Sequence, residues 1–336
     1  MRKAVVLVLV FAAGSCGRRA APADMATAGP PAGRALVQHG QQVYVRYCAT
    51  CHGPAANGYA ADNAPSLRTP TFLASASDAF LRAGIERGRP GTAMAAFGRA
   101  FGGPLAPGEV DALLAFVRNG ASEPREPLPS RPPGDAGRGR VVYDANCARC
   151  HGTPAQRQSA VHLVNPVLLA TATDGFLRFA IENGRPPTSM VPWKDVLTPA
   201  QIDDVIGYLR SLPQSLPAPA VPAPPPPGPP AAPRTGPVVL NPKGRAPEFQ
   251  LKDGLYVSID QVKQALDARR RLVIADARPP SDWSNMHIKG AISTPYYDLR
   301  SLDDIPKDGT WVLAYCACPH HVSGIVVEEL RKRGYP

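Results

Sequence analysis

The sequence lacks a membrane-spanning apolar segment, a run of basic residues and cysteines for structural disulfides, and each absence excludes one class of protein. Its longest apolar run, from Ala4 to Ala13, is shorter than the roughly 20 residues needed to span a bilayer. Its basic residues, which give a formal net charge of +10, are scattered, so we expect a solvated surface and no nucleic-acid partner. Its 7 cysteines comprise one at the end of the first apolar segment, four in two short motifs and two near the end of the sequence, and each group has an expected role that is described below. No pair is therefore left for a structural disulfide framework.

The first 16 residues have the pattern of a secretory signal. Arg2 and Lys3 precede the apolar run, and Gly14-Ser15-Cys16 has the small residues of a cleavage region. The segment from Ala13 to Cys16 also resembles a bacterial lipobox, in which Cys16 would carry the lipid anchor. Cleavage to a soluble periplasmic protein is the alternative. Both versions place the chain outside the bacterial cytoplasm.

Proline and glycine are abundant, at 40 and 30 residues, and segments rich in them indicate linkers between domains. A length of 336 residues predicts two to four domains. We expect the following division: a signal at 1–16, a tether at 17–33, domains at 34–122 and 136–213, Pro-rich linkers at 123–135 and 214–237, and a last domain at 238–336.

Two short motifs organise most of the chain. Cys48-Ala49-Thr50-Cys51-His52 returns as Cys147-Ala148-Arg149-Cys150-His151. In C-x-x-C-H the two thiols can each bond a vinyl group of one porphyrin, while the imidazole becomes the proximal iron ligand. A thioredoxin-like redox pair or half of a zinc site is the alternative for either motif. Two copies favour two covalently bound c-type haems.

The motifs belong to a longer internal repeat. Gly139 and Tyr143 follow Gly40 and Tyr44 by 99 positions, as the motif does, and after a three-residue deletion the offset becomes 96. At that offset Met94 and Met190 coincide, each in a loop that begins Gly-Arg-Pro. Because a gap-filling methionine need not recur in register, we expect both thioethers to be axial iron ligands.

Each repeat resembles the class I cytochromes c. Both copies place a glycine and a tyrosine in an N-terminal helix, and apolar residues in a C-terminal one, at positions Leu113 and Phe116 or Val205 and Tyr208. The resemblance implies a mostly α fold in which these helices cross. It also implies that the carbonyl of Pro65 orients His52. Val161 stands at the matching position of the second copy, so we expect a different partner for His151, and nearby His162 is a competing ligand or a solvated loop residue.

The last domain has a different pattern, in which strands and helices alternate. We expect strands at Tyr256–Ile259, Leu272–Ala275 and Trp311–Tyr315, with a helix at Asp260–Ala268, in a mostly parallel sheet. The segments 276–278, 282–283 and 287–295 resemble the rhodanese domain. The resemblance implies an α/β fold and a nucleophilic Cys316 that carries a persulfide. The family usually continues beyond Tyr335, so we expect this domain to be incomplete.

The loop after Cys316 departs from the family pattern. Pro319 and His321 stand where glycine and arginine are common, and Cys318 is an additional thiol. Three alternatives follow: sulfur transfer on Cys316, a dithiol cycle in which Cys318 resolves the bond, or an inactive or metal-binding loop.

The sequence therefore predicts a multidomain protein with two mostly α domains and one α/β domain. Its expected function is electron transfer through two His/Met haems, between a donor and an acceptor protein that the chain does not identify. A sulfur-oxidising enzyme that couples Cys316 and a small sulfur compound to the haems is the main alternative. A dihaem peroxidase is disfavoured because both methionines are present, and a docking role for the last domain is a further alternative.

Overall fold

The computed structural model describes residues 31–61, 63–120, 128–216, 236–317 and 321–335. The expected signal with Cys16, most of the tether, Cys318 and much of both Pro-rich linkers lie outside the described residues. Among the helices that are described, none is both long and apolar enough to cross a membrane.

The first domain is built on two crossing helices, α1 (Pro31–Tyr47) and α5 (Pro107–Arg118). Between them lie α2 (Ala49–His52), α3 (Pro70–Leu73), α4 (Asp78–Arg87) and the 3₁₀ turn η1 (Arg99–Phe101). Pro107 occupies the first position of α5, where its missing N–H has no cost. At the crossing, a Cβ on Gly40 would lie 1.9 Å from the carbonyl oxygen of Ala112. Glycine is therefore what allows the two backbones to touch.

The second domain repeats this arrangement with α6 (Ala136–Asn146), α7 (Ala148–His151), α8 (Pro166–Thr171), α9 (Asp174–Asn183) and α10 (Pro199–Ser211). A Cβ on Gly139 would lie 1.8 Å from the carbonyl oxygen of Asp204. The rings of Tyr143 and Tyr208 are 5.1 Å apart, as Tyr44 and Phe116 are 5.0 Å apart in the first domain. The predicted crossing pair is thus present in both copies.

A repeated arginine fastens the C-terminal helix of each copy to its short central helices. Arg118 donates to the carbonyl oxygen of Leu73 at 2.6 Å and to that of Ala76. Arg210 makes the two equivalent bonds in the second domain. One guanidinium satisfies two carbonyls because its donors are fixed in a plane.

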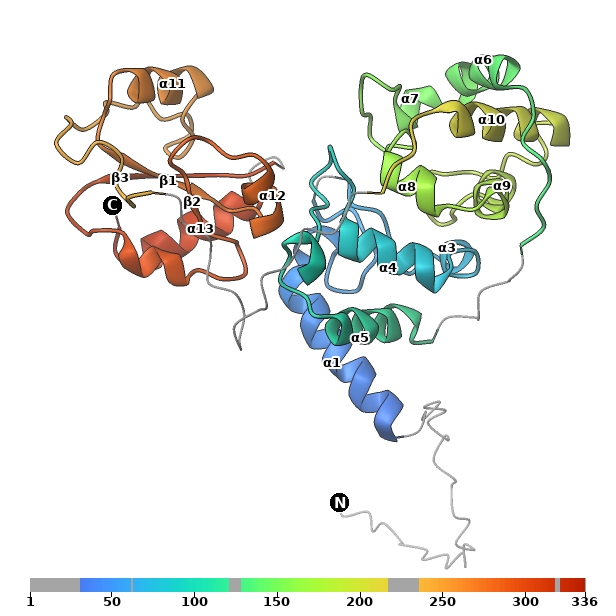
Figure 1. The fold of residues 1–336 in the computed structure, drawn as a ribbon, viewed down its shortest axis with the longest axis horizontal. Coiled ribbons are helices and arrows are strands. Elements are labelled where there is room, and N and C mark those ends of the chain that lie inside the picture. Colours follow the sequence, from blue (N-terminus) through green and yellow to red (C-terminus); the bar gives the residue numbers. More distant parts are fainter. Residues whose placement is uncertain (1–30, 62, 121–127, 217–235, 318–320, 336) are drawn as a thin grey trace, which may run out of the picture.

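The two copies face each other across their central helices, as Figure 1 shows for α3 and α4 against α8 and α9. The rings of Phe80 and Phe176, which are equivalent residues, lie 4.7 Å apart. Thr71 Oγ1 donates to the carbonyl of Gly184, and Asn165 Nδ2 donates in the opposite sense to the carbonyl of Pro90. Contacts that are reciprocal between equivalent segments define an approximate two-fold relation between the domains.

The last domain contains α11 (Ile259–Asp267), β1 (Leu272–Asp276), α12 (Pro280–Asn285), β2 (Ile292–Ser293), η2 (Arg300–Asp304), β3 (Trp311–Tyr315) and α13 (His321–Lys332). The strands form a parallel sheet in the order β2-β1-β3. All of β1 is buried, as the apolar run predicts.

The strand predicted at Tyr256–Ile259 is wrong. In place of a strand, Tyr256 forms an isolated bridge with Lys252, and Ile259 begins α11 with its side chain 86% exposed. The Ser258 side chain accepts the backbone N–H of Gln261 and so caps the helix. The cap outweighs the short apolar alternation that indicated a strand.

Candidate functional site

One tight turn brings each pair of motif cysteines and their histidine together. Cys51 N and His52 N both donate to the carbonyl of Cys48, at 3.1 and 2.9 Å. The equivalent bonds to Cys147 are 3.1 and 3.0 Å. Burial raises the pKa of the Cys48 thiol to about 12 and that of Cys147 to about 11. In each domain the two thiols are thus held on one helical turn, and the first of them is in the neutral form.

Backbone carbonyls orient both imidazoles. His52 Nδ1 lies 2.9 Å from the carbonyl oxygen of Pro65, and His151 Nδ1 lies 2.7 Å from that of Val161. Because a carbonyl can only accept, Nδ1–H donates and Nε2 is the nitrogen left for a metal. Burial also lowers the pKa of both histidines, which favours the neutral form that binds metal.

The expectation of a different partner for His151 is wrong. Its partner is the carbonyl of Val161, at the position that matches Pro65. The replaced side chain has no effect on this contact because the acceptor belongs to the backbone. His162, in turn, directs Nε2 at the carbonyl of Thr153 at 2.9 Å.

The two tyrosines of the crossing helices have a second role that the sequence did not reveal. Tyr44 donates its hydroxyl to the carbonyl of Gly53 at 2.6 Å, and Tyr143 donates to Gly152 at 2.8 Å. These bonds tie the first helix of each domain to the residue after its motif histidine. The one feature of the sequence that could have indicated this role is that the tyrosine occurs at the same position of both repeats.

The methionine loops have the same backbone frame in both domains. Arg89 N donates to the carbonyl of Met94, and Arg185 N donates to that of Met190, both at 2.7 Å. The N–H of each methionine donates to a threonine hydroxyl two residues earlier, at 3.1 and 3.2 Å. The structure thus places the two methionines equivalently, and their role as iron ligands stays a prediction.

Two half-buried arginines follow the same repeat. Arg89 and Arg185 lie over the rings of Phe80 and Phe176, with centroid distances of 5.2 Å each. Burial lowers the pKa of both to about 10. Among the described residues, no carboxylate forms an ion pair with either guanidinium. Arg185 instead donates to the carbonyl oxygen of Thr71 at 3.0 Å and to Ser75 Oγ at 3.2 Å.

These residues fit a c-type haem in each domain. The number and spacing of the thiols match the two vinyl groups of one porphyrin, and the oriented Nε2 of each histidine is the nitrogen that would bind its iron. The cysteines and histidines were predicted from the sequence and their roles stay predictions, whereas the arginines were not predicted, since an arginine in a Gly/Pro loop is usually solvated.

In the last domain Cys316 follows β3, at the carboxyl end of the parallel sheet. Its Sγ lies 3.3 Å from Ser323 Oγ, in the first turns of α13. The thiol is half-buried, between a strand end and a helix start. Such a position suits a nucleophile that is stabilised by helix N–H groups. Cys318, the expected resolving thiol, lies outside the described residues.

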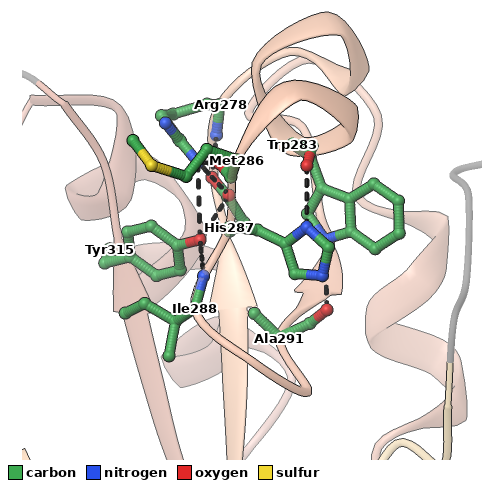
Figure 2. Close-up of polar contacts among 8 residues, drawn as sticks. Arg278, Trp283, Met286, His287, Ile288, Ala291 and Tyr315 are labelled. Atoms are coloured by element: carbon green, nitrogen blue, oxygen red, sulfur yellow. Dashed lines mark hydrogen bonds and ion pairs between the residues drawn. The ribbon is translucent and has the colours of Figure 1, made fainter.

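The residues that carried the rhodanese resemblance are engaged in structural contacts (Figure 2). Arg278 makes two bonds to buried Asp276, at 2.9 and 2.7 Å, and Tyr315 donates to the same carboxylate. The ring of His287 is stacked on Trp283 at 4.1 Å, and its Nδ1 donates to the Trp283 carbonyl at 2.8 Å. These contacts lock the ends of β1 and β3.

Comparison with known families identifies two cytochrome c domains followed by a rhodanese-like domain. The family model for cytochrome c oxidase, cbb3-type, subunit III matches residues 35–117 and 134–209, and the rhodanese-like domain model matches 258–336. The chain is 31% identical over 183 residues to the Cbb3-type cytochrome c oxidase subunit FixP of Bradyrhizobium sp. (strain ORS 278), covering 52% of this chain and 60% of that protein. It is 29% identical over 164 residues to the subunit CcoP of Azospirillum sp. (strain B510), covering 46% of each. The chain thus spans about half of the length of these relatives.

Proposed function

Since this chain carries two cytochrome c domains with covalently attached c-type haems, followed by a rhodanese-like domain, we propose that it is an electron carrier held outside the bacterial cytoplasm. The bound haem supplies a reversible one-electron centre in each domain. The chain's own residues hold, orient and shield that centre.

The proposed roles are the same in both domains. Cys48 and Cys51, or Cys147 and Cys150, form the thioether bonds. His52 and His151 bind iron through Nε2. Met94 and Met190 supply the second axial ligand, and a soft thioether raises the reduction potential relative to a nitrogen donor. Lipidation of Cys16 would hold the whole chain at a membrane surface.

The proposed partners are redox proteins of a respiratory electron-transfer chain. The matched relatives are subunits of cbb3-type oxidases, so a terminal oxidase or a carrier next to it is the proposed exchange partner. A carrier that donates and accepts single electrons suits a link between two such proteins.

The observation that carries the proposal is the duplicated methionine loop, with the same carbonyl bond at 2.7 Å in both copies. The test uses Met94→Ala and Met190→Ala in the full chain, produced with haem-attachment machinery. Each change should remove about half of the weak near-infrared band of sulfur-to-iron ligation and lower one reduction potential. Met286→Ala is the matched control, because that side chain is 75% exposed in the last domain. An unchanged band in both variants would remove the methionines from the ligand set.

A second function is favoured by the position of Cys316 beside the start of α13. Its thiolate would attack the outer sulfur of thiosulfate, so that an S–S bond forms on the cysteine, the S–S bond of thiosulfate breaks and sulfite leaves.

Thiosulfate should therefore add one sulfur atom to the full chain, as measured by intact mass, and Cys316→Ser should abolish the addition. Cys318→Ser distinguishes the alternatives, because persulfide formation survives that change while a dithiol cycle does not. Faster haem reduction by thiosulfate in wild type than in Cys316→Ser would support coupling to the haems.

A further inference from the structure

The rhodanese-like domain contacts the first cytochrome domain at its haem-attachment turn. Tyr296 donates its hydroxyl to the carbonyl of Tyr47, the residue directly before Cys48. The ring of Tyr297 meets the ring of Tyr47 edge-on, with centroids 4.7 Å apart. Burial raises the pKa of Tyr296 well above its usual value, and Cys48 is among the groups close enough to add to that effect.

The same domain also contacts the methionine loop. Ser281 Oγ donates to the carbonyl of Ala96 at 2.8 Å, and Ala93 packs against the apolar cluster of the last domain. These residues flank Met94. The rhodanese-like domain therefore bridges the two segments that hold the first haem, one on the cysteine side and one on the methionine side.

The matching surface of the second domain differs. Asn146 replaces Tyr47, so the aromatic contact has no counterpart. Val191 is 55% exposed and Val196 in the same loop is 65% exposed, whereas Ala95, the equivalent of Val191, packs in the core of the first domain and is 3% exposed. Figure 1 shows the last domain beside the first cytochrome domain and the second cytochrome domain above the first.

We propose that the rhodanese-like domain caps the first haem, so that external redox proteins exchange electrons with the chain at the second domain. Val191 and Val196 would form the apolar centre of that docking surface, because exposed apolar residues beside a redox centre suit a transient protein contact. A reduced partner docked there would give one electron to a haem held by Cys147, Cys150 and His151 and leave oxidised, and an oxidised partner would later remove that electron at the same surface. The inference rests on the proposed function as an electron carrier.

The test compares two single-haem versions of the full chain. Cys48→Ala/Cys51→Ala retains only the second haem, and Cys147→Ala/Cys150→Ala retains only the first. A reduced blue-copper protein should reduce the second haem at least about tenfold faster than the first in stopped-flow measurements, a ratio that corresponds to about 1.4 kcal/mol. Dithionite, which is small, should reduce both. Equal rates with the copper protein would overturn the cap, whereas failure of dithionite to reduce either haem would instead contradict the proposed function.

Variants at the contact between the rhodanese-like and first cytochrome domains, and at the proposed docking surface, test which surface limits each rate. Tyr297→Ala/Ser281→Ala should raise the rate for the first haem several-fold and leave the second unchanged. Val191→Asp should slow only the second haem, with Val45→Asp as the matched control because Val45 is 58% exposed on α1.

A readout that needs neither single-haem version is hydrogen exchange in the full dihaem chain. Amides 93–95 and 97 should exchange more slowly than the equivalent amides 189–191 and 193, and Tyr297→Ala/Ser281→Ala should remove that difference. Equal exchange of the two loops in wild type would also overturn the cap.

Discussion

Replacing Gly40 by alanine should force the crossing helices of the first domain apart. The new Cβ would lie 1.9 Å from the carbonyl oxygen of Ala112 and 2.9 Å from Cβ of Phe116, whereas ordinary contacts are 3.4–4 Å. One helix must therefore move by about 1.5 Å or more, which also separates the Tyr44 and Phe116 rings. Overpacking costs about 1–3 kcal/mol and loss of an aromatic pair about 0.5–1.5 kcal/mol. Alanine returns about 1 kcal/mol through its better helix propensity, which leaves a net loss of about 2 kcal/mol.

A loss of that size should lower the melting temperature of the first domain by roughly 10 °C. Thermal unfolding followed by far-UV circular dichroism would measure it on the haem-loaded chain. Gly108→Ala is the matched control, because this glycine lies on the partner helix α5 and a Cβ there has no neighbour within 4 Å. The control should be neutral or stabilising. Equal melting temperatures for the two variants would refute the argument that backbone contact requires Gly40.

Three further changes have predictable signs. Arg118→Lys or Arg210→Lys should cost its own domain about 1–3 kcal/mol in denaturant unfolding, because an ammonium cannot reach both carbonyls. Thr198→Ala removes a capping box and should cost about 1 kcal/mol, while Ala106→Thr at the equivalent position should gain a similar amount by the same measurement. Burial raises the pKa of Asp282 to about 6, so the folded state binds this proton more tightly than the unfolded state. Stability of the last domain should therefore rise as pH falls from about 7 towards 4, by up to about 3 kcal/mol, and the denaturant midpoint of Asp282→Asn should lack this dependence.

Local chemistry explains what the sequence could predict. The C-x-x-C-H turns, the prolines that begin helices and the apolar run of β1 each determine their own segment. The register of the repeat then predicted that Met94 and Met190 stand at equivalent places. Tyr256–Ile259 failed because a four-residue alternation is weaker than a serine cap.

Contacts between distant segments could not be predicted in this way. Nothing in the Gly-Arg-Pro sequence shows that Arg89 is half-buried, since that depends on how the two domains pack. The same holds for Tyr296, whose partner Tyr47 is 249 positions away. The carbonyl that orients His151 was missed for another reason: side-chain identity at position 161 carries no information about a backbone acceptor.

The meeting of Phe80 with its own duplicate Phe176 bears on how such a chain arises. A surface that contacts its own copy is self-complementary, so a single ancestral domain with this surface would pair with a second molecule of itself. Gene duplication and fusion convert that homodimer into one polypeptide. Once fused, the copies are no longer bound to stay identical, and each outer face can evolve alone. Tyr47 and Asn146 are one such difference between the copies. The outer face of the first copy contacts the last domain through Tyr47, and the outer face of the second copy is exposed at Val191 and Val196.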